Sequence, residues 1–352
     1  MLEDRMAYLQ DVYRITGRRF GYFMAQVANG SLTRKRKAPS ATTSLWNLEY
    51  EPDFAKGRKL YDLAKRKAWN PETDIDWNNK SAKDSLLTKD EYWGAYQMGL
   101  TEVLSEEETV ELNRRERAWV LSQILHGEQG SLLLCAQLVD MRPDMDGKLF
   151  LATQVMDEAR HVEVFTRYLK ELEIFPVDMN IKFIIDSLLG TPDWHKKAIG
   201  MLVLVEGYAM GAFSYTRRSN LDPLLDQILE FVMQDEGRHV GFGIDSIAEE
   251  VSHLDEAKRR ELEDYAFSLC RTLFYGRERG GFRSQVDLYW ESSRGRMGLN
   301  RPEFEKAVVT NRALNDFQED VFHNHLMANL KRLRLLSERV APRYAELGLA
   351  LN

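Results

Sequence analysis

Two copies of one pattern occur in the middle of the 352-residue chain, and both are built from residue types that bind metal ions. Each copy has a glutamate followed, 30 residues later, by the glutamate of an Asp-Glu-x-Arg-His motif. Four carboxylates and two imidazoles can hold two metal ions inside four packed helices. The six candidate catalytic and metal-binding residues are Glu128, Glu158, His161, Glu206, Glu236 and His239.

The spacing within each copy predicts that its two glutamates meet at one depth of a helical hairpin. About 13 residues separate Glu128 from a predicted turn near Met141, and about 12 more lead from the next helix start to Glu158, so both arms are roughly 20 Å long. The second copy has the same arrangement around a turn near residue 221. Positions i and i+3 share a helix face, so each Glu-x-x-His aims both groups at one point.

The donor set favours iron or manganese over zinc, because it has carboxylates and imidazoles but no thiolate pair. Taken alone, either Glu128 or Glu206 could be half exposed or paired with an arginine. The duplicated flanks and spacing favour metal binding instead. A third Glu-x-x-His ends at His253, but it lacks the preceding Asp and the Arg, and it follows His239 by about 21 Å of helix. We interpret it as a surface feature.

The residues that flank the candidate ligands predict a supporting shell. A metal-bound histidine needs an acceptor for its second ring nitrogen. Asp157 and Asp235 are each placed to accept from the histidine of the opposite hairpin, with Arg160 and Arg238 balancing their charge. Ordinary surface ion pairs are the alternative for these four residues.

The elements that position these groups are predicted to be helices throughout. Long stretches have a 3.6-residue apolar period, strand signals are nearly absent, and only nine prolines occur. Ser105 with Glu108 forms a capping box at the start of a long helix. The predicted helices are 3–28, 88–104, 105–140, 146–173, 178–189, 191–220, 222–252, 255–278 and 302–346.

No linker rich in Gly, Ser or Pro divides the chain, so the sequence predicts a single domain over residues 1–352. Within it we expect a wrapping N-terminal arm at 1–87, a bundle of four helices carrying the metal site at 105–255, and further helices at 256–352.

Composition excludes several function classes and suggests a compartment. A formal net charge of −7 and a pI near 5.7 argue against general nucleic-acid binding. The one basic run, at 34–37, is interpreted as a solvated loop. Two isolated cysteines, an N-terminus without an apolar signal core, and no apolar run near 18 residues predict a cytoplasmic protein that does not enter a membrane.

The paired motifs resemble the ferritin-like di-iron carboxylate superfamily over residues 105–255. Their Asp-Glu-x-Arg-His form looks most like that of bacterial multicomponent monooxygenase hydroxylases. The resemblance implies a ferritin-like four-helix bundle with additional N- and C-terminal helices. It also implies two iron ions, or manganese with iron, that activate O₂ and oxidise a small organic substrate. A ferredoxin or flavin reductase as electron donor and a homodimer are expected as well.

Five neighbouring positions depart from the specialised members of this superfamily. Phe165 stands where radical-bearing small subunits of class I ribonucleotide reductase usually carry a tyrosine. Ser131 and Met201 stand where ligand-binding oxidases join a valine to a tyrosine. Val232 replaces the extra histidine of arylamine N-oxygenases, and Met210 replaces the threonine of the multicomponent hydroxylases. No subgroup is matched in full.

Residues one turn from the candidate ligands are expected to line a substrate pocket, with plain core packing as the alternative for each. They are Ser131, Leu132, Cys135, Gln154, Phe165, Leu202, Met210, Phe213, Val232 and Gly243. The preferred function is a standalone di-iron oxygenase or oxidase that hydroxylates, N-oxygenates or desaturates its substrate. A radical-generating subunit serving another chain and ferritin-like iron storage or peroxide detoxification are the alternatives.

Overall fold

The structure, a computed structural model, describes residues 38–275, 283–293 and 295–349. Within these ranges the chain forms helices and no strand, apart from one isolated bridge between Thr88 and Asn220. The predicted all-α fold is therefore confirmed. The predicted helix at 3–28 and the basic loop at 34–37 lie outside the described residues.

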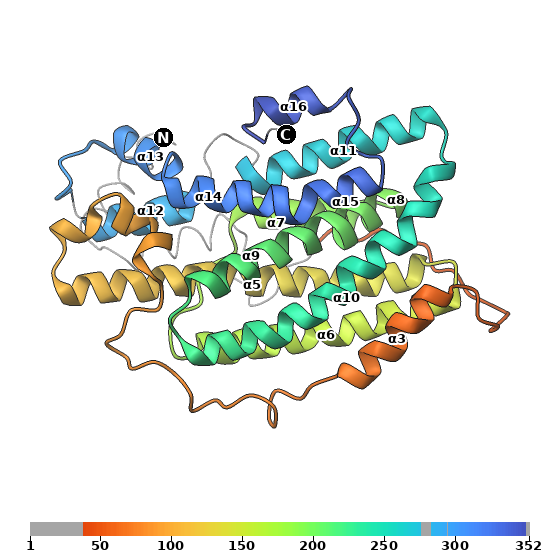
Figure 1. Ribbon diagram of the computed structural model, residues 1–352, viewed down its shortest axis with the longest axis horizontal. Helices are drawn as coiled ribbons and strands as arrows, with labels where there is room; N and C mark the ends of the chain where they lie inside the picture. The colour runs from red at the N-terminus through yellow and green to blue at the C-terminus, as the bar shows by residue number, and fades with distance from the viewer. Residues whose placement is uncertain (1–37, 276–282, 294, 350–352) are drawn as a thin grey trace, which may run out of the picture.

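Four helices form the bundle that holds the repeated motifs (Figure 1). They are α5 (Glu106–Met141), α6 (Met145–Leu169), α9 (Glu206–Ser219) and α10 (Pro223–His253). The capping box predicted at the start of α5 is present, since Glu108 N donates to Ser105 Oγ at 3.2 Å and Ser105 N donates to Glu108 Oε2 at 3.0 Å. α5 packs against α6, and α9 packs against α10, as two hairpins.

The helix predicted at 191–220 is interrupted immediately before its glutamate. It consists of α8 (Trp194–Ala198), a π-helical segment η3 (Ile199–Val205) and α9. π-helical turns occur often at functional sites. The span Trp194–Ser219 is long and apolar enough to cross a membrane, but 61% of that window is buried inside the protein. Core packing accounts for its apolar character.

The N-terminal arm contains a helix that the sequence pattern did not indicate. This helix, α3 (Ala55–Lys67), lies along the outside of α6 and also contacts α10 (Figure 1). The Phe54 ring meets the Phe242 ring edge-on at 6.0 Å, and Arg58 pairs with Asp146 at 2.6 Å. Beyond α3 the chain runs without regular structure below the bundle toward its far end (Figure 1).

The single helix predicted at 88–104 is wrong. The structure instead has three short pieces: η1 (Asp90–Tyr92), α4 (Gly94–Gln97) and η2 (Leu100–Val103). Extended backbone at Trp93 ends the first piece, and Gly99, with φ of +71°, ends the second. A left-handed backbone at Gly99 is incompatible with a continuous helix.

Most of the helices outside the bundle lie on its upper side in Figure 1. They are α7 (Met179–Gly190), α11 (Glu256–Tyr275), α12 (Arg283–Ser293), α13 (Arg301–Val309), α14 (Arg312–Val321), the π-helical η4 (Phe322–Leu326), α15 (Met327–Arg332) and α16 (Ala341–Glu346). The single helix predicted at 302–346 is therefore wrong as well. Asn311 caps a new helix by accepting from Ala313 N, and Arg334 adopts a positive φ of 56°.

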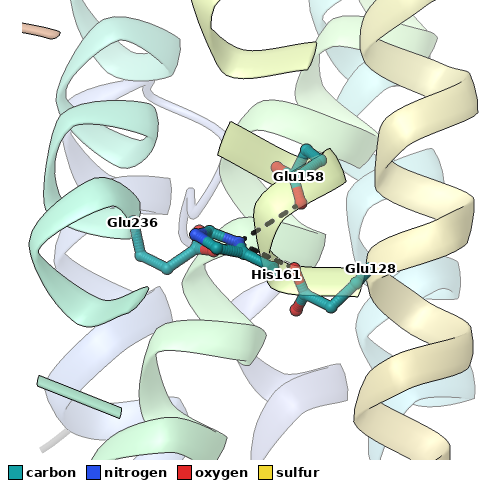
Figure 2. Close-up of side chains that lie close together, drawn as sticks. All are labelled: Glu128, Glu158, His161 and Glu236. Carbon is teal, nitrogen blue, oxygen red and sulfur yellow. Dashed lines mark hydrogen bonds and ion pairs between the residues drawn. The ribbon is translucent and has the colours of Figure 1, made fainter. Parts of the chain in front are cut away.

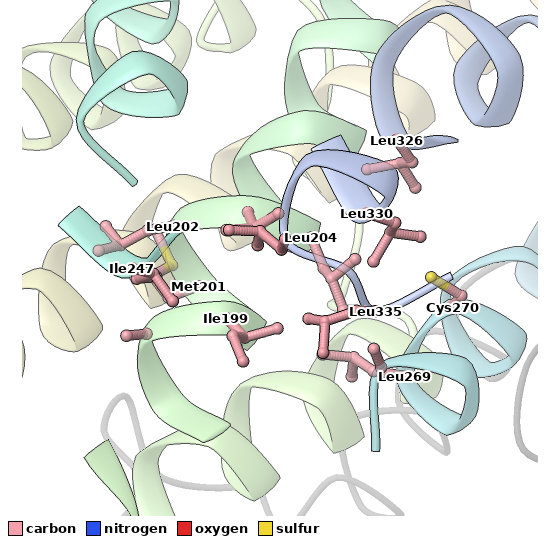
Figure 3. Packing of buried hydrophobic residues seen from close by; sticks show 14 of the residues in the cluster. Ile199, Met201, Leu202, Leu204, Ile247, Leu269, Cys270, Leu326, Leu330 and Leu335 are labelled. Atoms are coloured by element: carbon pink, nitrogen blue, oxygen red, sulfur yellow. The ribbon is translucent and has the colours of Figure 1, made fainter. Parts of the chain in front are cut away.

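A large apolar cluster surrounds the π-helical segment (Figure 3). Met201, Leu202 and Leu204 are fully buried, as are Ile247 of α10 and Leu326 of η4. Burial of each such side chain contributes about 1.5–3 kcal/mol relative to exposure. The segment that carries Glu206 is thus held by packing from several helices.

Candidate metal centre

The six predicted ligands converge in the centre of the bundle, and all are buried. Figure 2 shows Glu128, Glu158 and Glu236 around the His161 ring. His161 Nδ1 lies 3.0 Å from a Glu128 oxygen, 3.2 Å from a Glu236 oxygen and 3.7 Å from a Glu158 oxygen. One imidazole nitrogen therefore faces three carboxylates that come from α5, α6 and α10.

A second group of the same kind lies beside the first. His239 Nδ1 lies 3.2 Å from a Glu236 oxygen, 3.5 Å from a Glu158 oxygen and 3.9 Å from a Glu206 oxygen. The centroids of the two imidazole rings are 6.1 Å apart. Glu158 and Glu236 belong to both groups, so each could bridge two ions.

The donor atoms fit metal ions. In each group of four residues the candidate atoms lie within 4.8 Å of one another. Both carboxylate oxygens of Glu158 are buried and accept no hydrogen bond. An unpaired buried carboxylate is costly, and metal coordination removes that cost. The residues present therefore match two divalent cations.

Without metal ions the centre needs protons to offset its negative charge. Burial, followed by the charge of Glu158, raises the pKa of Glu128 well above its usual range. Burial and the charge of Glu236 raise the pKa of Glu206 in the same way. Burial disfavours the charged form of His161, but hydrogen bonds with Asp235 and Glu128 raise its pKa well above the ordinary value.

The aspartates contact the opposite hairpins, as the flanking pattern predicted. His161 Nε2 lies 3.2 Å from Asp235 Oδ2, and His239 Nε2 lies 3.2 Å from Asp157 Oδ2. A carboxylate only accepts, so each Nε2 carries a proton, which leaves Nδ1 as the ring nitrogen that would bind a metal ion.

Two arginines neutralise these aspartates. Arg160 Nη2 donates to Asp235 at 3.1 Å, and Arg238 Nη2 donates to Asp157 at 3.3 Å. Each arginine also contacts the aspartate of its own motif. The result is a buried network of two carboxylates and two guanidinium groups that joins α6 to α10 and holds both imidazoles.

Two further side chains complete the shell. Trp69 Nε1 donates to Asp235 Oδ2 at 2.8 Å, a contact that the sequence pattern does not indicate because Trp69 belongs to the irregular arm. Gln154 Nε2 donates to Glu206 Oε1 at 2.6 Å. Gln154, predicted as a pocket residue, thus contacts a predicted ligand directly.

A cavity of about 240 Å³ reaches the centre at Glu128. Of the residues predicted to line a pocket, Ser131 and Phe213 do so. The predicted residues that do not line this cavity are Leu132, Cys135, Gln154, Phe165, Leu202, Met210, Val232 and Gly243.

The positions of several of these residues explain why they do not line the cavity. Phe165 stacks on Phe213, with the ring centroids 5.9 Å apart and the planes 6° from parallel. Val232 belongs to the same apolar cluster as Phe165. A Cβ at Gly243 would lie 2.7 Å from the Leu202 Cβ, so close packing of α10 on the π-helical segment fills that space.

The third Glu-x-x-His does not join the centre. His253 is exposed, and its Nδ1 contacts the Glu249 carbonyl oxygen at 2.8 Å. Glu250 lies instead beside Arg142 at 3.3 Å and Trp194 Nε1 at 2.8 Å. This motif lies at the end of α10, apart from the centre, with His253 at the surface.

Solved structures with a similar chain path are R2-like ligand-binding oxidases. One variant with an anaerobically reconstituted Mn/Fe cofactor is 21% identical over 78% of this chain and 94% of its own, with a TM-score of 0.47. Another variant, aerobically reconstituted with Mn/Fe, is 20% identical over 82% of this chain and 95% of its own, with a TM-score of 0.49. No curated protein matches the chain.

A family model gives the assignment. The model described as p-aminobenzoate N-oxygenase AurF matches residues 54–276, a span that contains α3, both hairpins and all six predicted ligands. This confirms the predicted superfamily. The chain belongs to the AurF family, and it is a non-haem di-iron oxygenase or oxidase.

Proposed function

We propose that this protein is an O₂-dependent monooxygenase that oxidises a small organic molecule bound in the cavity beside Glu128. The single observation that carries this proposal is the contact between a largely apolar cavity and the buried carboxylate–imidazole centre. Pockets of this kind, with a few polar groups at the reacting end, are typical of small-molecule sites.

Each candidate ligand has a distinct part in this proposal. Glu128 and His161 would hold one ion, and Glu206 and His239 would hold the other. Glu158 and Glu236 would lie between the ions, because each belongs to both groups of donors. When bound, the iron pair supplies the coordination positions and electrons for reaction with O₂.

The surrounding residues keep this centre in shape. Asp157 and Asp235 fix the orientation of the two imidazoles, and Gln154 fixes that of Glu206 through its 2.6 Å hydrogen bond. Phe213 and Ile124 contribute apolar surface on the cavity side, which limits access of water. In the overall reaction one atom of O₂ enters the substrate. The other atom is reduced to water, which consumes two electrons from the donor and two protons.

Carbon and nitrogen are both candidates for the oxidised atom. The family's name supports N-oxygenation. The histidine that arylamine N-oxygenases carry four residues before their last Glu-x-x-His is Val232 here, fully buried among apolar side chains. We therefore propose six protein ligands for this centre.

We propose that the electrons for the reaction come from a separate protein. The chain contains two cysteines, whereas an Fe–S cluster of the common type needs four. We propose a ferredoxin or a flavin reductase as donor. A homodimer in the cytoplasm is proposed alongside, to be tested by light scattering and by cell fractionation.

The test is metal loading followed by isotope labelling. Protein loaded anaerobically with Fe(II) is expected to bind two ions per chain and then to transfer one ¹⁸O atom from ¹⁸O₂ to a turned-over substrate. Glu158→Ala is expected to lose the metal pair. Glu163→Ala, at an exposed position on the same helix, serves as the matched control. Full metal binding by Glu158→Ala would overturn the assignment.

A further inference from the structure

The cavity extends well beyond the metal centre along one face of α5. It begins at Ser131 and Glu128 and ends at Arg117 and Glu116. Arg117 and Glu128 are eleven residues apart, which is about three helical turns and roughly 16 Å along the axis. They therefore share a helix face, and a ligand that touched both would be elongated.

The middle of the cavity offers apolar surface. Val120 and Ile124 of α5, Ile181 of α7, and Ala209 and Phe213 of α9 line it. Such walls bind an apolar chain or ring system and provide no partner for a charge. Of the charged side chains that line the cavity, Glu128 lies at one end and Glu116 and Arg117 lie at the other.

At the remote end, the carboxylate of Glu116 already has its partners. It accepts hydrogen bonds from Tyr289 at 2.5 Å, from Gln285 at 3.1 Å, and from the Trp93 indole. Three donors satisfy a buried carboxylate. Glu116 therefore has no need of a cation from a ligand.

The guanidinium of Arg117 is in the opposite situation. The side chain is buried, with the residue 3% exposed. Nη2 donates to the Leu87 carbonyl oxygen at 3.4 Å and to Ser219 Oγ at 3.1 Å, while Nε has no acceptor. Among the described residues no carboxylate forms an ion pair with it. A buried, unpaired guanidinium is costly, and a bound anion offsets that cost.

We propose that Arg117 binds the carboxylate of an elongated, mostly apolar substrate whose other end lies beside Glu128. A guanidinium matches a carboxylate through parallel N–H donors. The nearby charges of Glu116 and Asp222 already offset part of the Arg117 charge, which favours a single negative charge over a phosphate dianion.

The field along the cavity fixes the direction of binding. Of the charged groups that line the cavity, Glu128 offers a carboxylate at the metal end, whereas Arg117 at the other end offers a guanidinium without an ion-pair partner among the described residues. The substrate therefore presents its uncharged end to the metals. This orientation refines the proposed function, on which it rests, by placing the oxidised atom at the end of the substrate remote from its carboxylate.

The test measures binding to metal-free protein, so that it does not depend on oxidation. Titration calorimetry with dodecanoate and with dodecan-1-ol is expected to give at least tenfold tighter binding of the acid, about 1.4 kcal/mol. Arg117→Gln is expected to abolish this difference, and Arg117→Lys to retain part of it. Arg115→Gln is the control, since Arg115 is on the same helix and pairs with Glu173 at 3.4 Å.

A second variant tests the other end of the cavity. Gly127 lines it, and a Cβ added there meets nothing within 4 Å. Gly127→Leu is expected to weaken dodecanoate at least tenfold and to leave the shorter octanoate unchanged. Equal binding of acid and alcohol by the wild type, or unchanged acid binding by Arg117→Gln or Gly127→Leu, would overturn the inference.

The experiments distinguish a failure of the Arg117 inference from a failure of the proposed monooxygenase function. Loss of selective acid binding with metal-dependent O₂ chemistry intact would remove the role of Arg117 alone. Selective acid binding by a protein that neither loads two metals nor consumes O₂ would remove the monooxygenase function alone.

Discussion

At the scale of single residues, each histidine of the centre is held between two kinds of carboxylate. Its Nδ1 faces the glutamates, and its Nε2 donates to an aspartate of the opposite hairpin. The acceptor makes the imidazole more basic and fixes the ring plane. Because each aspartate also contacts both arginines, its negative charge is retained in a buried site.

Replacement of Asp235 by asparagine tests this role. The amide removes the negative charge that holds the Nε2 proton of His161, so metal affinity is expected to fall by roughly 10- to 100-fold. Competition with a chromophoric chelator measures this change. Asp226→Asn on the same helix is the control, because Asp226 pairs with Arg217 at the surface. Unchanged metal affinity in Asp235→Asn would contradict the assigned role.

The sequence indicated the centre's own residues but not the contacts that reach it from elsewhere. The sequence alone predicts that Glu158 and His161 point to the same site, because helix periodicity fixes which residues share a face. Trp69 and Arg117 could not be placed in this way. Trp69 reaches Asp235 from an irregular segment 166 residues away, and the lack of an ion-pair partner for Arg117 depends on every element packed around it.

At the scale of elements, the π-helical segment shapes the third ligand helix. The α-helical hydrogen bonds of this helix give way to the wider turns of a π-helix directly before Glu206. The apolar composition at 199–205 fits an α-helix equally well, which is why the sequence pattern predicted no interruption. The wider turns bring the Leu202 backbone against α10 at Gly243, where no side chain could fit.

Two glycines on α10 provide a matched test of this packing. A Cβ at Gly243 collides with the Leu202 carbonyl, so Gly243→Ala is expected to destabilise the protein by about 1–3 kcal/mol. A Cβ at Gly241 meets nothing within 4 Å, so Gly241→Ala is expected to stabilise the helix by up to about 1 kcal/mol. Urea unfolding measures both. Equal effects of the two changes would argue against close contact with the π-helical segment.

The element boundaries that were predicted incorrectly have local causes. Periodicity continued through 88–104 and 302–346, but hydrogen bonds and backbone geometry divide both segments. Asn311 caps α14 and also donates to the Gly94 carbonyl oxygen at 3.0 Å, so the break at 311 is fixed partly by α4. Contacts between residues far apart in the sequence override local helix propensity.

At the scale of the whole molecule, one buried lysine ties the arm to the bundle. Lys197 of α8 is fully buried. Its Nζ donates to the Ala41 carbonyl oxygen at 2.8 Å, to the Leu189 carbonyl oxygen at 3.4 Å and to the Gln137 side chain. The arm, α5, α7 and α8 therefore meet at one ammonium group that has no carboxylate partner among these contacts.

This lysine predicts a pH dependence of stability. Burial lowers the pKa of Lys197 to about 8, from an ordinary value of 10.5. Between these values the unfolded chain keeps the proton and the folded protein releases it, so the contribution of Lys197 to stability rises with pH, by at most about 1.4 kcal/mol per unit. Below pH 8 its burial cost is constant. Urea unfolding at pH 7.5 and 9.5 should show this rise in the wild type and a smaller rise in Lys197→Met; identical rises would contradict it.

The centre also determines how the whole molecule responds to metal removal. Four buried glutamates balance two divalent ions, while the two aspartates and two arginines balance each other. Chelation leaves these glutamates either charged without a partner or protonated, and the folded state loses the free energy of metal binding. The loss is about 4 kcal/mol for each ion when free metal is at a thousand times its Kd.

Chelator-treated protein is therefore expected to melt at a lower temperature in scanning calorimetry, and Fe(II) or Mn(II) is expected to restore the original transition. Mg(II) is expected to restore little, since it prefers oxygen ligands and retains its water shell, whereas each group here includes an imidazole. Glu158→Ala removes the carboxylate shared by both groups, so its melting temperature should respond little to any of these ions. A full Fe(II)-dependent rise in that variant would mean that the stabilising ions bind somewhere other than between the two hairpins.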